Sequence, residues 1–173
     1  MMADVITRLV TPGDATELAA VLAANREFLG PWEPYRPEDF YTPEGQRTYL
    51  EDALRMRDAG TALPHVIVDD GRIVGRITLQ AIARGPFQSA SLGYWVAEAA
   101  NGRGLASAAV ARMVRIAFDD LGLHRVEGST LVHNAASQRV LERNGFRRYG
   151  LAPRFLKING DWRDHVLYQL LAD

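Results

Sequence analysis

The pattern of apolar and polar positions predicts alternating strands and helices along the chain. Residues 5–11 alternate as a strand does, and a helical apolar period follows over 15–26, with Asp14 placed as its N-cap. Thr42 precedes a proline, a favoured pair at a helix start, so a second helix is predicted over 43–59. The amino-terminal part of the chain is therefore expected to contain one strand and two helices.

A period of two residues then returns. Residues 63–68 and 72–82 are rich in β-branched side chains and flank an Asp-Asp-Gly turn, which predicts a hairpin. Residues 90–96 predict a third strand, and antiparallel pairing of the three strands is the simplest arrangement. A helical period from Leu105 to Leu121 follows, and Gly122 is placed to end that helix.

The last third of the chain repeats the alternation. Residues 125–132 predict a strand and 134–144 a short helix. An irregular strand begins at Phe146, and residues 155–158 and 162–171 flank an Asn-Gly-Asp turn, which predicts a final hairpin. The predicted order is strand, two helices, three strands, helix, strand, helix and two strands.

The composition fits one globular domain over residues 1–173, at roughly 100–200 residues per domain. The chain is 47% hydrophobic and 24% charged, and its 20 basic and 21 acidic residues nearly cancel. We therefore expect no direct binding of nucleic acid and no attraction to a membrane. No signal-peptide pattern and no apolar run near the ~20 residues of a membrane span is present, so a cytoplasmic location is expected. Without cysteine, and with four histidines at no ligand spacing, the sequence predicts no metal site.

The main candidate for chemistry is a glycine-bearing turn that leads from the strand at 90–96 into the helix at Leu105. The first N–H groups of a helix have no internal partner and attract phosphate. Gly102 and Gly104 allow the backbone to approach a ligand closely. A glycine turn that only caps a helix has the same pattern. The spacing of a P-loop or of a dinucleotide fingerprint is not present.

This turn resembles the acyl-CoA-binding motif of the GNAT acetyltransferases, Gln/Arg-x-x-Gly-x-Gly/Ala. Asn101, Gly104 and Ala106 stand at its three defined positions, and Asn101 departs from the usual Gln or Arg. Downstream, residues 134–146 read Asn-Ala-Ala-Ser-Gln-Arg-Val-Leu-Glu-Arg-Asn-Gly-Phe. Together with residues 162–168, this segment is similar to the ribosomal-protein N-acetyltransferases of the RimJ/RimL type. The resemblance covers nearly the whole chain.

The resemblance implies an α+β fold, the GNAT fold, in which about four helices flank a mixed, mostly antiparallel sheet of about 6–7 strands. The sheet is expected to splay between the strands at 90–96 and 125–132, with the pantetheine arm of acetyl-CoA in the gap. The residues expected to bind acetyl-CoA are Trp95, Val96, Asn101, Gly102, Arg103, Gly104, Leu105, Ala106, Ser107, Asn134, Arg139 and Arg143. For the three arginines, a solvated surface charge is the alternative.

The resemblance also implies direct attack of an amine on the thioester. That reaction needs oriented substrates and a proton donor for the departing thiolate. Many family members place a tyrosine acid seven residues after the motif asparagine, where this chain has Leu141. Ser137, one helical turn beyond Asn134, is the expected substitute, and Asn134 is expected to bind the cofactor or an ordered water. The local alternatives are a Ser137 bonded to its own backbone and an Asn134 that caps the helix.

No general base is evident from the sequence. A protein α-amine has a pKa of about 7.7–8.0 and a lysine amine one of about 10.4, so far more of the α-amine is neutral at pH 7. Weak base catalysis therefore favours an α-amine acceptor. We expect water to relay the proton to solvent or to a carboxylate such as Glu98 or Asp164.

Aromatic side chains are expected to wall the acceptor pocket, although burial in the core is their commoner role. The candidates are Trp32 and Tyr35, in a proline-rich loop, with Phe87 and Tyr94.

The expected function is acetyl transfer to an amine, with the N-terminal α-amine of a ribosomal protein as the leading acceptor by resemblance. Two alternatives stay open: a small amine such as an antibiotic, a polyamine or an amino acid, and a CoA-binding regulatory module without turnover. A cationic acceptor needs several carboxylates in its pocket, and only Glu33, Glu38 and Asp39 can be placed near it. The family also allows a homodimer.

Overall fold

Seven strands form one mixed sheet in the computed structural model, which describes residues 6–173. In chain order the strands are β1 (Ile6–Leu9), β2 (Leu63–Asp69), β3 (Arg72–Ala83), β4 (Ser89–Val96), β5 (Arg125–Leu131), β6 (Arg147–Ile158) and β7 (Asp161–Leu171). The helices are α1 (Ala15–Ala24), α2 (Arg26–Leu29), α3 (Pro43–Asp58), α4 (Leu105–Arg115) and α5 (Ala135–Arg143). The strand order in the sheet is β1-β2-β3-β4-β5-β7-β6. The predicted fold class is confirmed.

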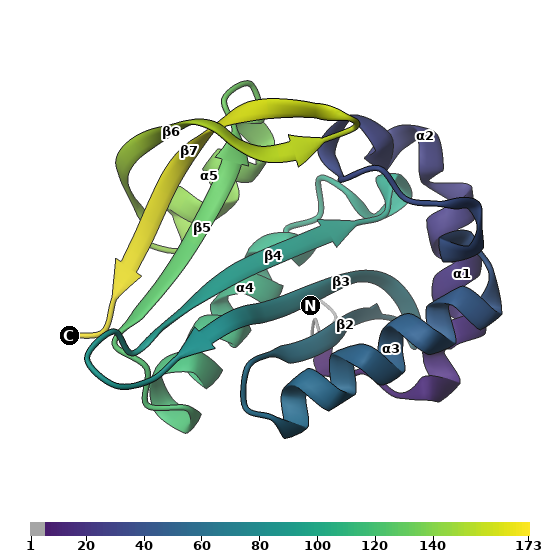
Figure 1. The fold of residues 1–173 in the computed structure, drawn as a ribbon, viewed down its shortest axis with the longest axis horizontal. Helices are drawn as coiled ribbons and strands as arrows, with labels where there is room; N and C mark the ends of the chain where they lie inside the picture. Colours follow the sequence, from purple (N-terminus) through teal and green to yellow (C-terminus); the bar gives the residue numbers. More distant parts are fainter. Residues whose placement is uncertain (1–5) are drawn as a thin grey trace.

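The sheet opens between its two central strands. All neighbouring strands are antiparallel except β4 and β5, which run parallel and pair only from Ser89 with Arg125 to Leu92 with Gly128. Beyond Leu92, β4 continues to Val96 with no partner on the β5 side. Figure 1 shows the two strands diverging toward the end of the sheet where the β6–β7 hairpin approaches α2. The predicted splay is confirmed.

Helices cover both faces of the sheet, and each face has its own apolar core. Residues of α4 and α5 such as Met113 and Leu141 pack with one face, while Leu18 of α1 and Leu50 of α3 pack with the other (Figure 1). Neighbouring residues of a strand point to opposite faces. Tyr94 accordingly packs with the α4 side and Trp95 with the α1 side, so β4 connects the two faces at the split.

The two predicted helix caps have different outcomes. The Thr42 hydroxyl accepts a hydrogen bond of 3.1 Å from the Gly45 N–H, which confirms the start of α3. Asp14 does not cap α1 with its side chain. Its carboxylate instead accepts hydrogen bonds from the Arg8 guanidinium, at 2.8 and 2.9 Å, and from the Thr11 N–H at 2.8 Å.

Two predicted helices are shorter than their apolar periods indicate. The helix predicted over 15–26 ends at Ala24, where the Asn25 amide group donates to the Val21 carbonyl, and α2 follows as a separate turn. The helix predicted to reach Leu121 leaves the α conformation after Arg115 and closes with a π turn, in which the Leu121 N–H donates to Ile116. A side-chain bond to the backbone and a wider turn preserve the apolar face, so the sequence period does not reveal either change.

The first strand and β6 differ in their bounds from the prediction. Val5, the predicted start of the first strand, lies outside the described residues, and β1 ends at Leu9. The irregular strand expected from Phe146 and the segment at 155–158 form one strand, β6, with register shifts between 148 and 150 and between 152 and 156. The final hairpin is confirmed.

Candidate functional site

The turn before α4 presents a run of free N–H groups. Gly102 and Gly104 have φ angles of 75° and 77°, a left-handed conformation that favours glycine. The first helical bond runs from the Ala108 N–H to the Gly104 carbonyl at 3.0 Å. Within residues 6–173, no acceptor receives the N–H groups of residues 102–107. Those donors and the helix dipole together suit a phosphate group.

One side chain and one backbone N–H group of this turn are engaged within the protein. The Arg103 guanidinium donates to the buried Asp69 carboxylate at the end of β2, over 2.7 Å. The Asn101 N–H donates to the Glu98 carbonyl at 3.1 Å. The structure therefore leaves the Arg103 backbone N–H, rather than its guanidinium, available to a ligand.

Helix α5 lies next to the same turn. The Asn144 amide at its end donates to the Ser107 carbonyl, at 3.2 Å, and to the Ser107 hydroxyl, at 3.1 Å. Arg139 and Arg143 are exposed, one helical turn apart, and make no ion pair in the part of the chain that the structure describes. They are the two predicted arginines that remain available for phosphates.

Three predicted residues meet where β4 and β5 have separated. The Ser137 N–H donates to the Asn134 side-chain oxygen at 3.1 Å, so Asn134 caps α5, as one of the sequence interpretations expected. The Tyr94 and Ser137 hydroxyl oxygens lie 2.8 Å apart. Burial raises the pKa of Tyr94 to about 12, which keeps that phenol protonated at neutral pH. Tyr94 is thus a partner of Ser137 on the α5 side of the sheet.

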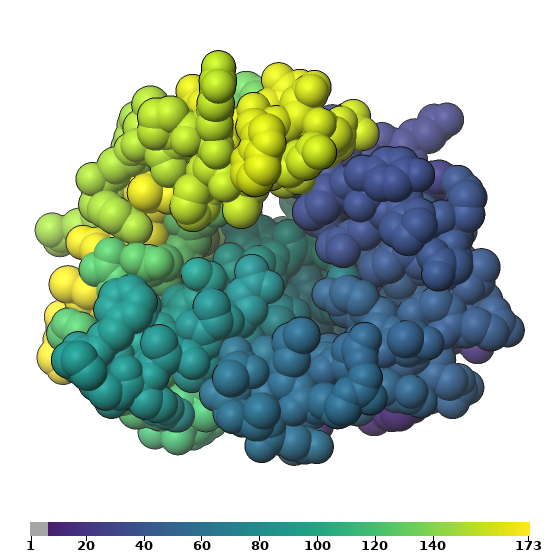
Figure 2. All heavy atoms as spheres, in the orientation of Figure 1, coloured from purple at the N-terminus to yellow at the C-terminus, as the bar shows by residue number. Residues whose placement is uncertain are grey.

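A pocket of about 550 Å³ opens on the other face of the sheet. It is bordered by α1, α2, the loop after α2, strands β3 and β4, and the tip of the β6–β7 hairpin. Figure 2 shows the opening between the yellow β6–β7 hairpin and the dark blue segment that follows α2. Tyr35, one of the predicted acceptor-site residues, lines this pocket, and so does the indole of Trp95, for which only the backbone was expected to act.

Three of the four predicted aromatic residues lie outside the pocket lining, and one of them is Tyr94, which contacts Ser137 on the α5 side of the sheet. The Trp32 ring packs on His133, with 5.2 Å between ring centroids, and is outside the pocket lining. Phe87 lies in the β3–β4 turn, at the opposite end of β4 from Trp95, and its side chain is exposed. Glu98 and Asp164, the predicted proton relays, are exposed and are also outside the lining.

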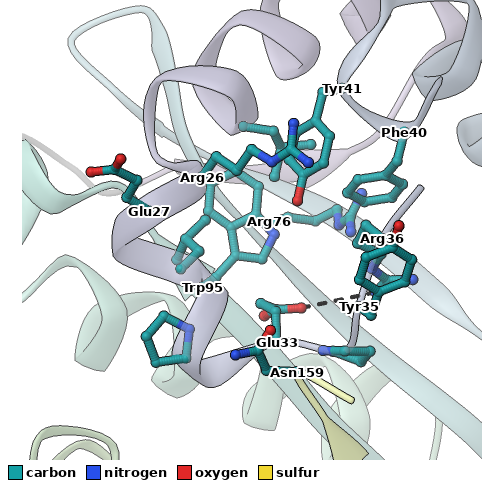
Figure 3. Close-up of a pocket in the computed structure, with 15 residues that line it drawn as sticks. Arg26, Glu27, Glu33, Tyr35, Arg36, Phe40, Tyr41, Arg76, Trp95 and Asn159 are labelled. Atoms are coloured by element: carbon teal, nitrogen blue, oxygen red, sulfur yellow. Dashed lines mark ion pairs between the residues drawn. The ribbon is translucent and has the colours of Figure 1, made fainter. Parts of the chain in front are cut away.

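The charges in the pocket lining nearly balance, because Arg26 is paired with Glu38, just outside the lining. Among its fifteen lining residues, three are arginines (Arg26, Arg36, Arg76) and two are glutamates (Glu27, Glu33). Arg76 is only 6% exposed, and its guanidinium lies 4.3 Å from the centre of the Tyr49 ring. Burial raises the pKa of Glu33, while the positive charges of Arg36 and Arg76 oppose that rise. Figure 3 shows Glu33 within the lining, joined to Arg36 by an ion pair of 3.9 Å.

Sequence reasoning assigned no role to Arg76 and placed Glu33 only near the acceptor. A signal for Arg76 was available, because it interrupts the apolar strand from Ile73 to Leu79 with a charge that a buried strand rarely carries alone. Glu33 stands between two prolines in a loop, and no sequence pattern indicates the direction of its side chain.

Two kinds of structural feature are absent from residues 6–173. This part of the chain contains no group of three histidine or acidic side chains arranged to hold a metal ion. None of its helices combines the length and apolar character that crossing a membrane requires.

Comparison with known proteins gives concordant results. The family model of the acetyltransferase (GNAT) domain matches residues 4–147. A probable N-acetyltransferase of Bacillus subtilis, YjcK, is 37% identical over 161 residues, which cover 91% of this chain and 88% of that protein. The [ribosomal protein uS5]-alanine N-acetyltransferase of Escherichia coli is 35% identical over 167 residues, covering 95% and 86%. The solved structure of Mycobacterium smegmatis RimJ in complex with CoA-disulfide has a TM-score of 0.94 and 34% identity, covering 97% and 82%.

Proposed function

The chain belongs to the acetyltransferase (GNAT) family, and on this premise we propose that it transfers acetyl from acetyl-CoA to the N-terminal α-amine of a protein. A ribosomal protein is the proposed acceptor, in agreement with the name of the uS5-alanine relative. This acceptor places the reaction in the cytoplasm, and the proposal treats residues 1–173 as one catalytic domain that works alone or as a homodimer.

The α4 side of the sheet supports the binding of acetyl-CoA. The N–H groups of residues 102–107, without protein acceptors in residues 6–173, would hold the pyrophosphate at the start of α4. Arg139 and Arg143 would contact further phosphate oxygens. The pantetheine arm would lie along the unpaired end of β4, where the backbone of Trp95 and Val96 offers hydrogen bonds. Bound acetyl-CoA supplies an activated acyl group, and the protein orients it.

The observation that carries the choice of acceptor is the charge of the second pocket. With three arginines and two glutamates in the lining, and Arg26 paired with Glu38, the pocket offers no excess of carboxylates to a polyamine or an aminoglycoside, which bring several positive charges. A protein N-terminus brings one amine and a series of carbonyl oxygens. Such an acceptor could enter the pocket beside Trp95 and reach the split between β4 and β5.

Ser137 and Asn134 have the proposed catalytic roles on the α5 side. The Ser137 hydroxyl would donate a proton to the departing thiolate, and Tyr94, at 2.8 Å, would in turn donate to Ser137. The Asn134 side-chain oxygen fixes the first turn of α5 through the Ser137 N–H and thereby positions the serine. Its amide nitrogen, which has no partner in residues 6–173, could bind the cofactor or a water.

The acceptor is tested by following free thiol while the protein is incubated with acetyl-CoA and a panel of amines. The panel contains peptides that begin with alanine or serine, the same peptides with a blocked N-terminus and one internal lysine, a polyamine and free amino acids. We expect thiol release with the unblocked peptides only, and mass spectrometry should locate the acetyl group on the α-amine. Release with the polyamine alone would reject the proposal, and acetyl-CoA binding without release for any amine would favour a regulatory module.

Gly104→Ala tests the pyrophosphate site, with Gly60→Ala as a matched control. Both glycines have a φ of 77°, and an added Cβ meets no atom within 4 Å at either position. Each substitution should cost about 1–2 kcal/mol of folding stability because of the left-handed backbone. Only at Gly104 would the methyl group lie beside the free N–H groups of the turn. We therefore expect the KM for acetyl-CoA to rise in Gly104→Ala alone. The expected rise is roughly tenfold, which corresponds to the loss of one charge-assisted hydrogen bond of about 1.5 kcal/mol.

The comparison needs thermal unfolding and the KM for acetyl-CoA of both variants. Equal KM values in the two variants would show that the turn does not bind the cofactor.

A further inference from the structure

The pocket on the α1 face contains hydrogen-bond donors that have no acceptor. The Trp95 indole N–H, one N–H group of Arg76 and one of Arg36 are buried without a partner in the described part of the chain. Trp95 and Arg76 are only 8% and 6% exposed, and all three residues line the pocket. Buried donors are rarely left unpaired in a folded protein, because each unpaired group costs about 1–3 kcal/mol. The missing acceptors are therefore expected from the ligand.

Glu33 is the carboxylate among these donors. Its position is fixed by the backbone: the Glu33 carbonyl accepts from the Asn159 N–H at the hairpin tip, over 3.0 Å, and Pro34 restricts the residue before it to the extended conformation that Glu33 has. About 29% of the side-chain surface remains exposed, so a ligand can reach it. A fixed and reachable carboxylate in a partly dry pocket has the properties of a general base.

The two faces of β4 complete the arrangement. Ser137 and Tyr94 lie on the α5 side of the split, whereas Glu33 and the Trp95 side chain lie in the pocket on the other side. A thioester held between β4 and β5 would thus meet a proton donor from one face and a proton acceptor from the other.

Resting on the proposed function, we propose that the Glu33 carboxylate takes the proton of the attacking amine, while the Trp95 and Arg76 N–H groups bind the carbonyl oxygen next to that amine. The amine nitrogen forms the new bond to the acetyl carbon, and the carbon–sulfur bond breaks with its electron pair on sulfur. One amine proton passes to Glu33, and sulfur receives a proton from the Ser137 hydroxyl. Solvent returns the Glu33 proton to the serine, which balances the reaction. The acceptor class is an α-amine followed by a carbonyl group.

The pH dependence follows from the surroundings of Glu33. The base acts when ionised, so the rate rises with pH through its pKa, and burial moves that rise above the ordinary value of 4.5. Arg36 from the same loop and Arg76 from β3 limit the shift. The other titratable groups of the lining are Arg26, Glu27, Tyr35 and Tyr41.

Glu33→Gln is the test, with Glu33→Asp as the conservative variant and Glu51→Gln, an exposed residue of α3, as the control. With an alanine-initiated peptide we expect Glu33→Gln to lower kcat roughly 30- to 100-fold, within reach of general base catalysis, and, apart from the limb that the acceptor amine itself adds at about pH 7.7–8.0, to remove the acid limb that follows the Glu33 pKa. Glu33→Asp should keep that limb with part of the rate. Melting temperature and acetyl-CoA Kd should stay within error of wild type, as should all parameters of Glu51→Gln.

Carbonyl binding is tested with propylamine, which has the amine without the carbonyl. We expect its KM, expressed as the concentration of neutral amine, to exceed that of alaninamide at least tenfold in wild type, and the two values to approach each other in Trp95→Phe. An unchanged acid limb in Glu33→Gln, or a loss of acetyl-CoA affinity in that variant, would overturn the proposal. If small amines react and peptides do not, the proposed protein acceptor is wrong, and the role of Glu33 is tested with the amine that reacts. If no amine reacts, both proposals are wrong.

Discussion

Gly75→Ala is expected to destabilise the fold by about 3 kcal/mol, the upper range for an overpacked core position. Gly75 lies in β3, opposite Ile67 of β2 on one side and Val96 of β4 on the other. A Cβ at this position would lie 2.3 Å from the Trp95 carbonyl oxygen and 3.2 Å from the Val96 Cα. Both atoms belong to backbone, so β3 and β4 must separate to make room.

Gly93→Ala is the matched control, because Gly93 is a glycine of the adjacent strand whose added Cβ would meet only the end of the Gln80 side chain, at 3.7 Å. That variant should be as stable as wild type or more stable by up to about 1 kcal/mol, since glycine weakens a strand. Urea denaturation of the three proteins measures the difference. Equal midpoints for Gly75→Ala and wild type would mean that the two strands do not approach as closely as described.

The close approach at Gly75 also affects function. The atoms that an added methyl group would displace belong to Trp95 and Val96, at the end of β4 where the strand loses its β5 partner. A shift there moves the Trp95 indole in the proposed acceptor pocket and the backbone along which the pantetheine arm is proposed to lie. We therefore attribute the tight contact between β3 and β4 to a requirement for a fixed strand beside the split.

Local patterns sufficed to predict the two hairpins and the start of α3. The Asp-Asp-Gly and Asn-Gly-Asp turns each join two segments of strand period, and Thr42 with Pro43 marks a helix start that the structure confirms. These signals involve neighbours in sequence. Asp14 had the same kind of local signal and was wrong as a cap, because Arg8 of β1 is close in space and binds the carboxylate more strongly than a backbone N–H does.

In the candidate site too, short motifs revealed some features, whereas contacts between distant segments were missed. The turn at residues 102–107 and the Ser137–Asn134 pair were identified from short motifs, and the structure brings Tyr94 to Ser137 across the split. The proposed acceptor pocket combines residues from six elements, namely α1, α2, the loop after α2, β3, β4 and the β6–β7 tip, and Arg103 finds its partner in β2. A contact between distant segments leaves no periodic signal in the sequence, so neither the pocket nor the Glu33 position followed from it.

Ser137→Ala is expected to lower kcat by roughly 10²–10³-fold, as for the loss of a general acid. The hydroxyl lies at the split and receives support from Tyr94 at 2.8 Å, while the Asn134 cap uses the Ser137 backbone and survives the substitution. The KM for acetyl-CoA should therefore change by less than about threefold, since the proton is needed when the thiolate departs and not when the cofactor binds. Ser91→Ala, on β4 and outside the proposed site, is the control and should match wild type.

Tyr94→Phe decides which hydroxyl is the acid. The phenol pKa of about 12, raised by burial, makes Tyr94 a weaker proton source than an ordinary tyrosine, and its hydroxyl lies 2.8 Å from the Ser137 hydroxyl oxygen. We expect a loss of roughly tenfold in Tyr94→Phe, smaller than in Ser137→Ala, because the serine then lacks only its supporting donor. Steady-state kcat values of the two variants and the double variant provide the comparison. If Tyr94→Phe loses more activity than Ser137→Ala, the phenol donates the proton directly and Ser137 is its positioning residue.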